Sequence, residues 1–167
     1  MVQQRLFLFI TTLFLLTIIN GVIYYNEKVL ETGTPLLLEL APYDPRALLQ
    51  GDYMRLNYKL AVQLQRDYPS ATLQKYQKII ITLDEQGVAQ FVDFYQANQT
   101  LSIGQHILDY TLKKKRIVFA TDSFFFQEGH AKHYEQAHYG ELRVTSSGKS
   151  ILIGLRDKNA MLINIKE

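Results

Sequence analysis

The side chains best able to do chemistry gather in residues 128–138, EGHAKHYEQAH, which hold three of the four histidines of the chain. Imidazole and carboxylate groups are ligands for zinc and iron, and a helix brings side chains three or four positions apart onto one face. A helical di-iron site needs two Glu-x-x-His pairs and two further glutamates, and this segment offers one pair, Glu135 with His138. The candidate metal ligands are Glu128, His130, His133 and Glu135.

A short amphipathic helix is the competing interpretation of the same segment. Between Gly129 and Gly140 it would pack Ala131, Tyr134 and Ala137 inward and leave the imidazoles in solvent. Because the ligand set is incomplete, the sequence favours this helix. We expect neither a metal nor another cofactor.

The composition narrows the classes of protein to which the chain can belong. Its 167 residues, 47% hydrophobic and 20% charged, describe one small globular domain, alone or with an appendage. The absence of cysteine excludes disulfides, thiolate zinc sites and cysteine nucleophiles. Eighteen basic and 16 acidic residues give a net charge of +2, so the broad basic surface of a nucleic-acid binder is missing. We expect no nucleic-acid partner.

The appendage is the N-terminus, where residues 6–25, LFLFITTLFLLTIINGVIYY, carry no charge. At about 1.5 Å of rise per residue, a helix of this length covers about 30 Å, the thickness of the hydrocarbon core of a bilayer. Tyr24 and Tyr25 fall where an interfacial aromatic belt would lie. The segment is therefore predicted to be a transmembrane helix, with the lipid bilayer as its partner.

A cleaved secretory signal is the alternative, but such signals have an apolar stretch of about 7–15 residues followed by small residues. Here bulky residues follow a longer stretch, which favours a retained signal anchor at 1–26 and a short connector at 27–33. Arg5 and the terminal amine, against Lys28 and two glutamates, favour a cytoplasmic N-terminus. In a bacterium, a single pass through the inner membrane would then place residues 34–167 in the periplasm.

From residue 34 onward, apolar residues alternate with polar ones, which is typical of half-buried strands. Pairs of such runs predict β-hairpins at 78–95, 106–121 and 141–155. Short helices are expected at 60–68 and 129–140. The predicted fold is mainly β, a β-rich α+β domain. It is a small antiparallel β-sandwich or open barrel with about two short helices, behind an N-terminal transmembrane helix.

The segment 51–60, GDYMRLNYKL, is expected to be a strand that opens on a glycine. Gly51 would turn the chain, and Asp52 could accept hydrogen bonds from backbone amides or from Arg46, Arg143 or Arg156. Alternation would place Met54, Leu56, Tyr58 and Leu60 on the core face and Tyr53, Arg55, Asn57 and Lys59 on the other. A structural role for Asp52 is favoured over a catalytic one.

The stretch GDYMRLNY resembles the signature of the GDYXXLXY membrane proteins of bacteria, through Gly51, Asp52, Tyr53, Leu56 and Tyr58. Residues 36–54, 124–144 and 151–157 are similar to other stretches of that family. The family is uncharacterised. The resemblance implies a membrane anchor, a compact soluble domain and a multi-spanning membrane partner rather than a reaction.

A leader-peptidase-type serine protease also combines a signal anchor with a β-rich domain and a Gly-Asp pair at the start of a strand. Alignment on Gly51 and Asp52 places Tyr43 where the nucleophilic serine of that family stands. Lys59 lies too early for the general-base lysine. Without a hydroxyl beside an activating amine, this mechanism has no nucleophile, so enzymatic activity of this type is not expected.

Three consecutive phenylalanines, 124 to 126, place aromatic surface on both faces of a strand. The favoured interpretation buries both faces beneath the core and a covering helix; the alternative exposes one phenylalanine to a partner. The run KKKR at 113–116 could contact anionic lipid, but lysines at a hairpin tip more often protect an edge from strand addition.

Two functions from different classes remain open. The first is a membrane-anchored interaction module that docks on an integral membrane protein through Phe124, Phe125, Phe126, Tyr134 and Tyr139. Its loops would be held by Asp44, Arg46, Asp52, Arg156 and Asp157. The second is an envelope hydrolase or metal-dependent enzyme that uses the His/Glu cluster at 128–138. The missing nucleophile and the incomplete ligand set favour the first.

Overall fold

The structure, a computed structural model, describes residues 2–41 and 53–163. Some of the predicted motif and loop residues lie outside the described residues: Asp44, Arg46, Gly51 and Asp52.

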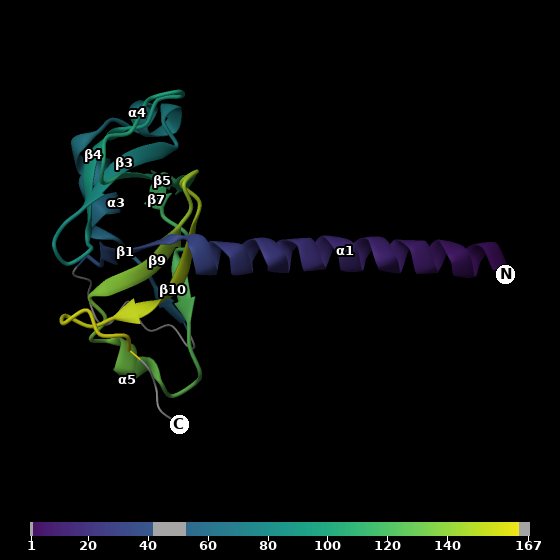
Figure 1. Cartoon of the computed structure of the whole chain (residues 1–167). Coiled ribbons are helices and arrows are strands. Elements are labelled where there is room, and N and C mark those ends of the chain that lie inside the picture. Colours follow the sequence, from purple (N-terminus) through teal and green to yellow (C-terminus); the bar gives the residue numbers. More distant parts are fainter. Residues whose placement is uncertain (1, 42–52, 164–167) are drawn as a thin grey trace.

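The N-terminal helix α1 (Val2–Thr32) is a single continuous element of 31 residues. It is long and apolar enough to span a membrane, and none of its most apolar stretch is buried against the domain. Thr11 and Thr17 donate their hydroxyl hydrogens to the carbonyls of Phe7 and Leu13, each at 2.9 Å, so their polar groups are satisfied within the helix. Figure 1 shows α1 projecting from the side of the β domain, with the N-terminus far from it.

Residues 27–32, most of the predicted connector, continue α1 instead of forming an extended linker. The helix ends at Gly33, whose amide donates to the carbonyl of Val29 at 2.9 Å. The Val29 side chain is buried against the domain. The domain is therefore joined directly to the helix end.

The sheet beside the end of α1 has three antiparallel strands in the order β1-β9-β10. Leu36 pairs with Leu142, and Leu142 pairs with Leu152, so apolar side chains line up across the sheet. The hairpin of β9 and β10 confirms the one predicted at 141–155. These strands are β1 (Thr34–Glu39), β9 (Tyr139–Val144) and β10 (Ser150–Arg156).

A second antiparallel sheet has the order β4-β3-β5. Its β3–β4 hairpin is the predicted one, with Gly87 in the turn at φ +78°. In the hairpin predicted at 106–121, β5 pairs with β3 instead, so the hairpin itself is limited to β6 and β7. The strands are β3 (Lys78–Leu83), β4 (Ala89–Phe94), β5 (Gln105–Asp109), β6 (Thr111–Lys113) and β7 (Arg116–Val118).

Short helices cover the sheets. The predicted helix at 60–68 is confirmed as α3 (Lys59–Asp67), which buries Leu60, Ala61 and Leu64 and ends before Pro69. The helix α4 (Ser70–Lys75) follows directly and was not predicted.

The helix expected at 129–140 is reduced to the single turn α5 (Ala131–Tyr134). The sequence prediction is too long here because the amide of His138 donates to the carbonyl of Arg156 at 2.8 Å, which draws the chain into β9. Tyr134 is buried, as the amphipathic interpretation expects.

One hydrophobic cluster joins the sheets and helices, which confirms the β-rich α+β class with antiparallel sheets. Its most enclosed side chains come from both three-stranded sheets, from α3 and from the chain after β7. They include Leu38, Leu64, Ile79, Ile81, Leu108, Phe119 and Leu142.

Candidate functional site

In the described part of the segment predicted as a strand, residues 53–60, the only strand is the short β2 (Tyr53–Arg55), which pairs with β8 (Ser123–Phe125). The predicted strand is too long, because Tyr58 forms an isolated β-bridge with Leu40 and the helix α3 begins at the next residue, Lys59. The predicted alternation of burial nevertheless holds. Met54, Leu56, Tyr58 and Leu60 are buried, whereas Arg55 and Lys59 are exposed.

Tyr58 is a core residue, 2% exposed. Its ring lies over Gly140 of β9, where an added Cβ would lie 3.1 Å from the ring carbon Cε1. It also contacts the Phe119 ring edge-on, with the centroids 6.1 Å apart. The Tyr58 hydroxyl finds no hydrogen-bond partner among the described residues, and burial raises its pKa well above the ordinary value.

Leu56 also connects two segments that are distant in the sequence. Its side chain is buried, and its amide donates to the carbonyl of Asp122 at 2.9 Å. Leu56 and Tyr58 therefore hold β2, β8, β1 and α3 together.

A family model described as GDYXXLXY protein matches residues 15–155. The chain belongs to the GDYXXLXY family. No curated protein and no solved structure matches it. Of the three described residues that define the GDYXXLXY signature, Leu56 and Tyr58 are buried in the core and Tyr53 is half-buried.

Tyr53 of the GDYXXLXY signature belongs to an exposed group that we call the aromatic–basic surface. The Tyr53 ring lies against the Phe125 ring with centroids 5.8 Å apart, and Phe125 is 76% exposed. A cavity of about 450 Å³ lies at this surface. The surface comprises Tyr53, Arg55, Lys113, Lys114, Arg116 and Phe125.

Charge on the aromatic–basic surface is mostly positive. Its four cations face one carboxylate in the same cavity, Asp122, which lies 3.5 Å from the Lys113 ammonium. Positive φ at Lys114 and Lys115 makes the tight β6–β7 turn that presents this charge. The surface combines an apolar centre with a cationic surround.

The expectation that both faces of the phenylalanine strand are covered is wrong for Phe125. Phe124 and Phe126 pack on Tyr134, with ring centroids 5.0 and 5.3 Å away. Phe125 lies on the opposite face of β8, beside the Tyr53 ring, and is 76% exposed. Tyr139, the last predicted interaction residue, is half-buried beside His138.

The His/Glu cluster does not come together as a ligand set. The rings of His130 and His133 lie 5.8 Å apart, but α5 ends at Tyr134, and His138 follows after a turn. Glu135 and His138 therefore do not share a helical face. Within residues 2–41 and 53–163, no group of three or more His, Asp or Glu side chains is placed to hold a metal ion.

Two of the predicted loop-holding residues, Arg156 and Asp157, lie where β10 ends. The guanidinium of Arg156 donates from Nε to Oε2 of the buried Glu141 at 2.8 Å, and its Nη2 lies 2.8 Å from the same oxygen in an ion pair. Asp157 accepts the amides of Asn159 and Met161 at 2.9 Å. Arg143, another suggested partner of Asp52, donates to the carbonyl of Gly33 at 3.3 Å and so supports the end of α1.

A second site, which we call the helix-end cavity, is not predicted by the sequence. It measures about 730 Å³ and lies between the last three turns of α1, strand β5 and the β9–β10 turn. No pattern in the sequence indicates it, because its walls come from three distant segments. Its walls include Gly21, Tyr24, Tyr25, Lys28, Leu101, His106, Ile107, Thr145, Ser146 and Ser147.

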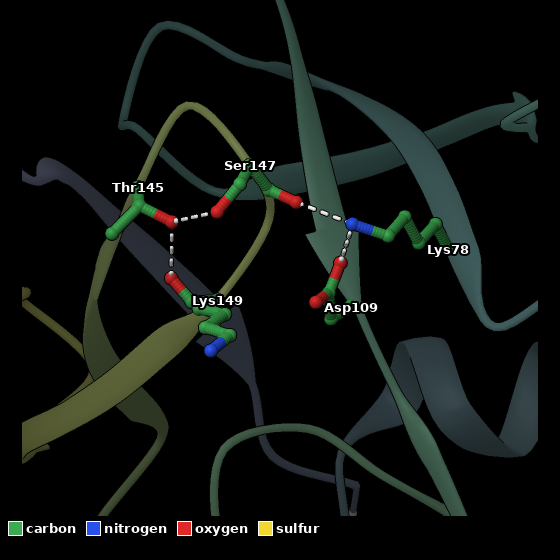
Figure 2. Close-up of polar contacts among 5 residues, drawn as sticks. All are labelled: Lys78, Asp109, Thr145, Ser147 and Lys149. Atoms are coloured by element: carbon green, nitrogen blue, oxygen red, sulfur yellow. Dashed lines mark hydrogen bonds and ion pairs between the residues drawn. The ribbon is translucent and has the colours of Figure 1, made fainter. Parts of the chain in front are cut away.

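A polar network fixes the turn that walls this cavity (Figure 2). Lys78 donates to the carbonyl of Ser147 at 2.6 Å and pairs with the Asp109 carboxylate at 3.2 Å. Thr145 bonds the Ser147 hydroxyl at 2.9 Å and the carbonyl of Lys149 at 3.2 Å. The turn is thus tied to β3 and β5.

The same turn reaches α1, since the Lys149 ammonium lies 5.4 Å from the centre of the Tyr25 ring. The helix end therefore contacts the domain through both Val29 and Tyr25.

Proposed function

We propose that this protein is a membrane-anchored accessory module of the bacterial envelope. Its β domain lies in the periplasm, tethered to the inner membrane by α1 with a cytoplasmic N-terminus, and docks on an integral membrane protein. The observation that carries the proposal is the aromatic–basic surface, whose central Phe125 is 76% exposed in a domain joined to an apolar helix.

The composition of the surface supports docking on a protein. Interfaces are enriched in aromatic residues and arginine, and their energetic centres are aromatic or arginine side chains surrounded by polar groups. Phe125 and Tyr53 provide the apolar centre, and the surrounding cations suit a partner with acidic residues beside an apolar pocket.

Because the protein is anchored in the membrane, a small docking surface is sufficient. A module confined to the membrane meets a membrane partner at a raised effective concentration, so a modest interface suffices. The GDYXXLXY signature supports a docking role, because its buried residues Leu56 and Tyr58 hold in place the strand β2, which carries Tyr53.

Affinity purification of the full-length chain from native membranes in mild detergent tests the proposal. We expect a stoichiometric multi-spanning protein to co-purify, and Phe125→Ala to reduce its recovery about tenfold or more, as loss of an interface hot spot does. The matched control is Ile103→Ala, which removes another fully exposed apolar side chain outside this surface. Recovery of the chain alone, or equal losses in both variants, contradicts the proposal.

The topology is tested separately, because the chain contains no cysteine that would interfere with labelling. We expect a membrane-impermeant maleimide to label Gln127→Cys in cells with a permeabilised outer membrane, and Gln4→Cys only after lysis. The reverse pattern would overturn the orientation. Intact mass of the membrane-extracted protein checks that residues 1–26 are retained.

A further inference from the structure

The helix-end cavity has a wall that runs along α1 from Gly21 to Thr32. Gly21 leaves this wall open, since a Cβ built there meets nothing within 4 Å. The opposite wall is formed by β5 and the β9–β10 turn, which the Lys78 network holds in place. The cavity is thus a fixed space between the helix and the domain.

The cavity crosses the edge of the apolar segment of α1. Gly21, Tyr24 and Tyr25 belong to the uncharged run 6–25, whereas Lys28 lies one turn beyond it, at about 1.5 Å of rise per residue. When α1 spans a bilayer, the cavity therefore opens at the boundary between hydrocarbon and headgroups.

From the apolar segment of α1 toward the domain, the lining of the cavity changes from apolar to polar. Apolar and aromatic groups lie at the bilayer end of the helix wall. The lining also includes the Lys28 ammonium and the His106 imidazole, and it contains no carboxylate. The hydroxyl of Ser146 adds a hydrogen-bond donor on the domain side, beside the Thr145 and Ser147 hydroxyls that hold the turn. A volume of about 730 Å³ lies in the usual range for small-molecule sites, roughly 300–1,000 Å³.

We propose that the helix-end cavity binds a phospholipid of the leaflet next to the domain. Its acyl chains would run along Gly21 and Tyr24, and its phosphate would face Lys28 and the hydroxyl of Ser146. A transmembrane helix of a partner fits less well, because β5 and the turn wall the cavity on the domain side, whereas a lipid ends at the headgroup layer. The proposal shares with the proposed function only the insertion of α1 in a membrane, and it needs no protein partner.

Photo-crosslinking in nanodiscs tests this site with the purified full-length chain. The probe is phosphatidylglycerol with a diazirine close to the glycerol. We expect crosslinks on residues 101–107 and 144–147 of the domain as well as on α1. Crosslinks confined to α1 would show only the surrounding bilayer lipid and overturn the proposal.

A pair of helix variants gives the matched control. Gly21→Phe places a ring at the cavity wall, where an added Cβ meets nothing within 4 Å, and we expect it to abolish the crosslinks to residues 144–147. Ile23→Phe places the same ring on a position of α1 that does not line the helix-end cavity, and the crosslinks should persist. Equal crosslinking in both variants would overturn the proposal.

Two further experiments identify which chemical group the cavity recognises. Lys28→Gln should reduce the domain crosslinks, because it removes the cation nearest the apolar boundary. Added inorganic phosphate should leave them unchanged; competition would assign the site to a free anion and overturn the lipid proposal. A chain that fails to insert in the nanodisc contradicts this proposal and the proposed function together, whereas an inserted chain without domain crosslinks contradicts only this one.

Discussion

Gly148 in the β9–β10 turn lies so close to Asp109 of β5 that an added Cβ would lie 2.2 Å from the carboxylate oxygen Oδ1. The Asp109 amide donates to the carbonyl of Gly148 at 2.9 Å, and Gly148 has a φ of +101°. This close approach lets Lys78 bridge the turn and the strand. It sets the position of the wall of the helix-end cavity.

Gly148→Ala should lower the free energy of unfolding by more than about 2 kcal/mol, because positive-φ strain alone costs about 1–2 kcal/mol and the clash with Asp109 adds to it. Urea unfolding of the detergent-solubilised chain, followed by circular dichroism, measures the change. The control is Gly129→Ala, which has a φ of +84° but open space around its Cβ. Similar losses in both variants would show that the approach to Asp109 costs nothing.

Tyr58→Phe should leave the free energy of unfolding unchanged or raise it by up to about 1 kcal/mol, because its buried hydroxyl has no partner among the described residues. Tyr58→Ala should cost about 3–5 kcal/mol, since it removes the ring from Phe119 and Gly140. Chemical unfolding of both variants checks this. A loss above about 1 kcal/mol in Tyr58→Phe would reveal a hydrogen bond of that hydroxyl.

The Tyr110 hydroxyl donates to the carbonyls of Tyr76 and Leu73, and burial raises the pKa of Tyr110 to about 12. Since the folded pKa lies above the ordinary value of about 10, the stabilising effect is complete below pH about 10 and is lost as the pH rises through about 12.

Tyr110→Phe should therefore be less stable than the unmodified chain near pH 8, by about 1 kcal/mol for the lost hydrogen bonding. The difference should shrink between pH about 10 and 12, because phenylalanine does not ionise. Unfolding curves across this range measure it. A constant difference would exclude ionisation of Tyr110 as a cause of alkaline unfolding.

Arg156→Met should cost about 3 kcal/mol, because it leaves the Glu141 carboxylate buried without its cation. Adding Glu141→Leu should restore much of the lost stability, since an apolar pair avoids the uncompensated charge. Thermal or chemical unfolding of the single and double variants forms the test. A double variant no more stable than Arg156→Met would show that the ion pair does not control stability here.

Much of the local structure follows from the sequence because it depends on neighbouring residues. The uncharged run at 6–25 predicts a helix long enough to span a membrane, and the alternation in 78–95 with Gly87 predicts the β3–β4 hairpin. The alternation in 53–60 also predicts which side chains are buried, although the backbone changes there from strand to helix.

Other local patterns lead to wrong lengths because longer-range bonds compete with them. The helix expected at 129–140 stops at Tyr134, since His138 bonds to the carbonyl of Arg156. The hairpin expected at 106–121 divides because β5 pairs with β3. In each case, backbone groups find partners far away in the sequence.

The sequence by itself determined the apolar helix, the β-rich class and the family, because composition, periodicity and the GDYXXLXY signature are properties of short segments. Only the tertiary structure decided that Phe125 is exposed beside Tyr53 and the basic turn. It also decided that a cavity lies where α1 meets β5 and the β9–β10 turn. These surfaces depend on contacts between residues far apart in the chain, and such contacts are set by packing the whole core rather than by any local pattern.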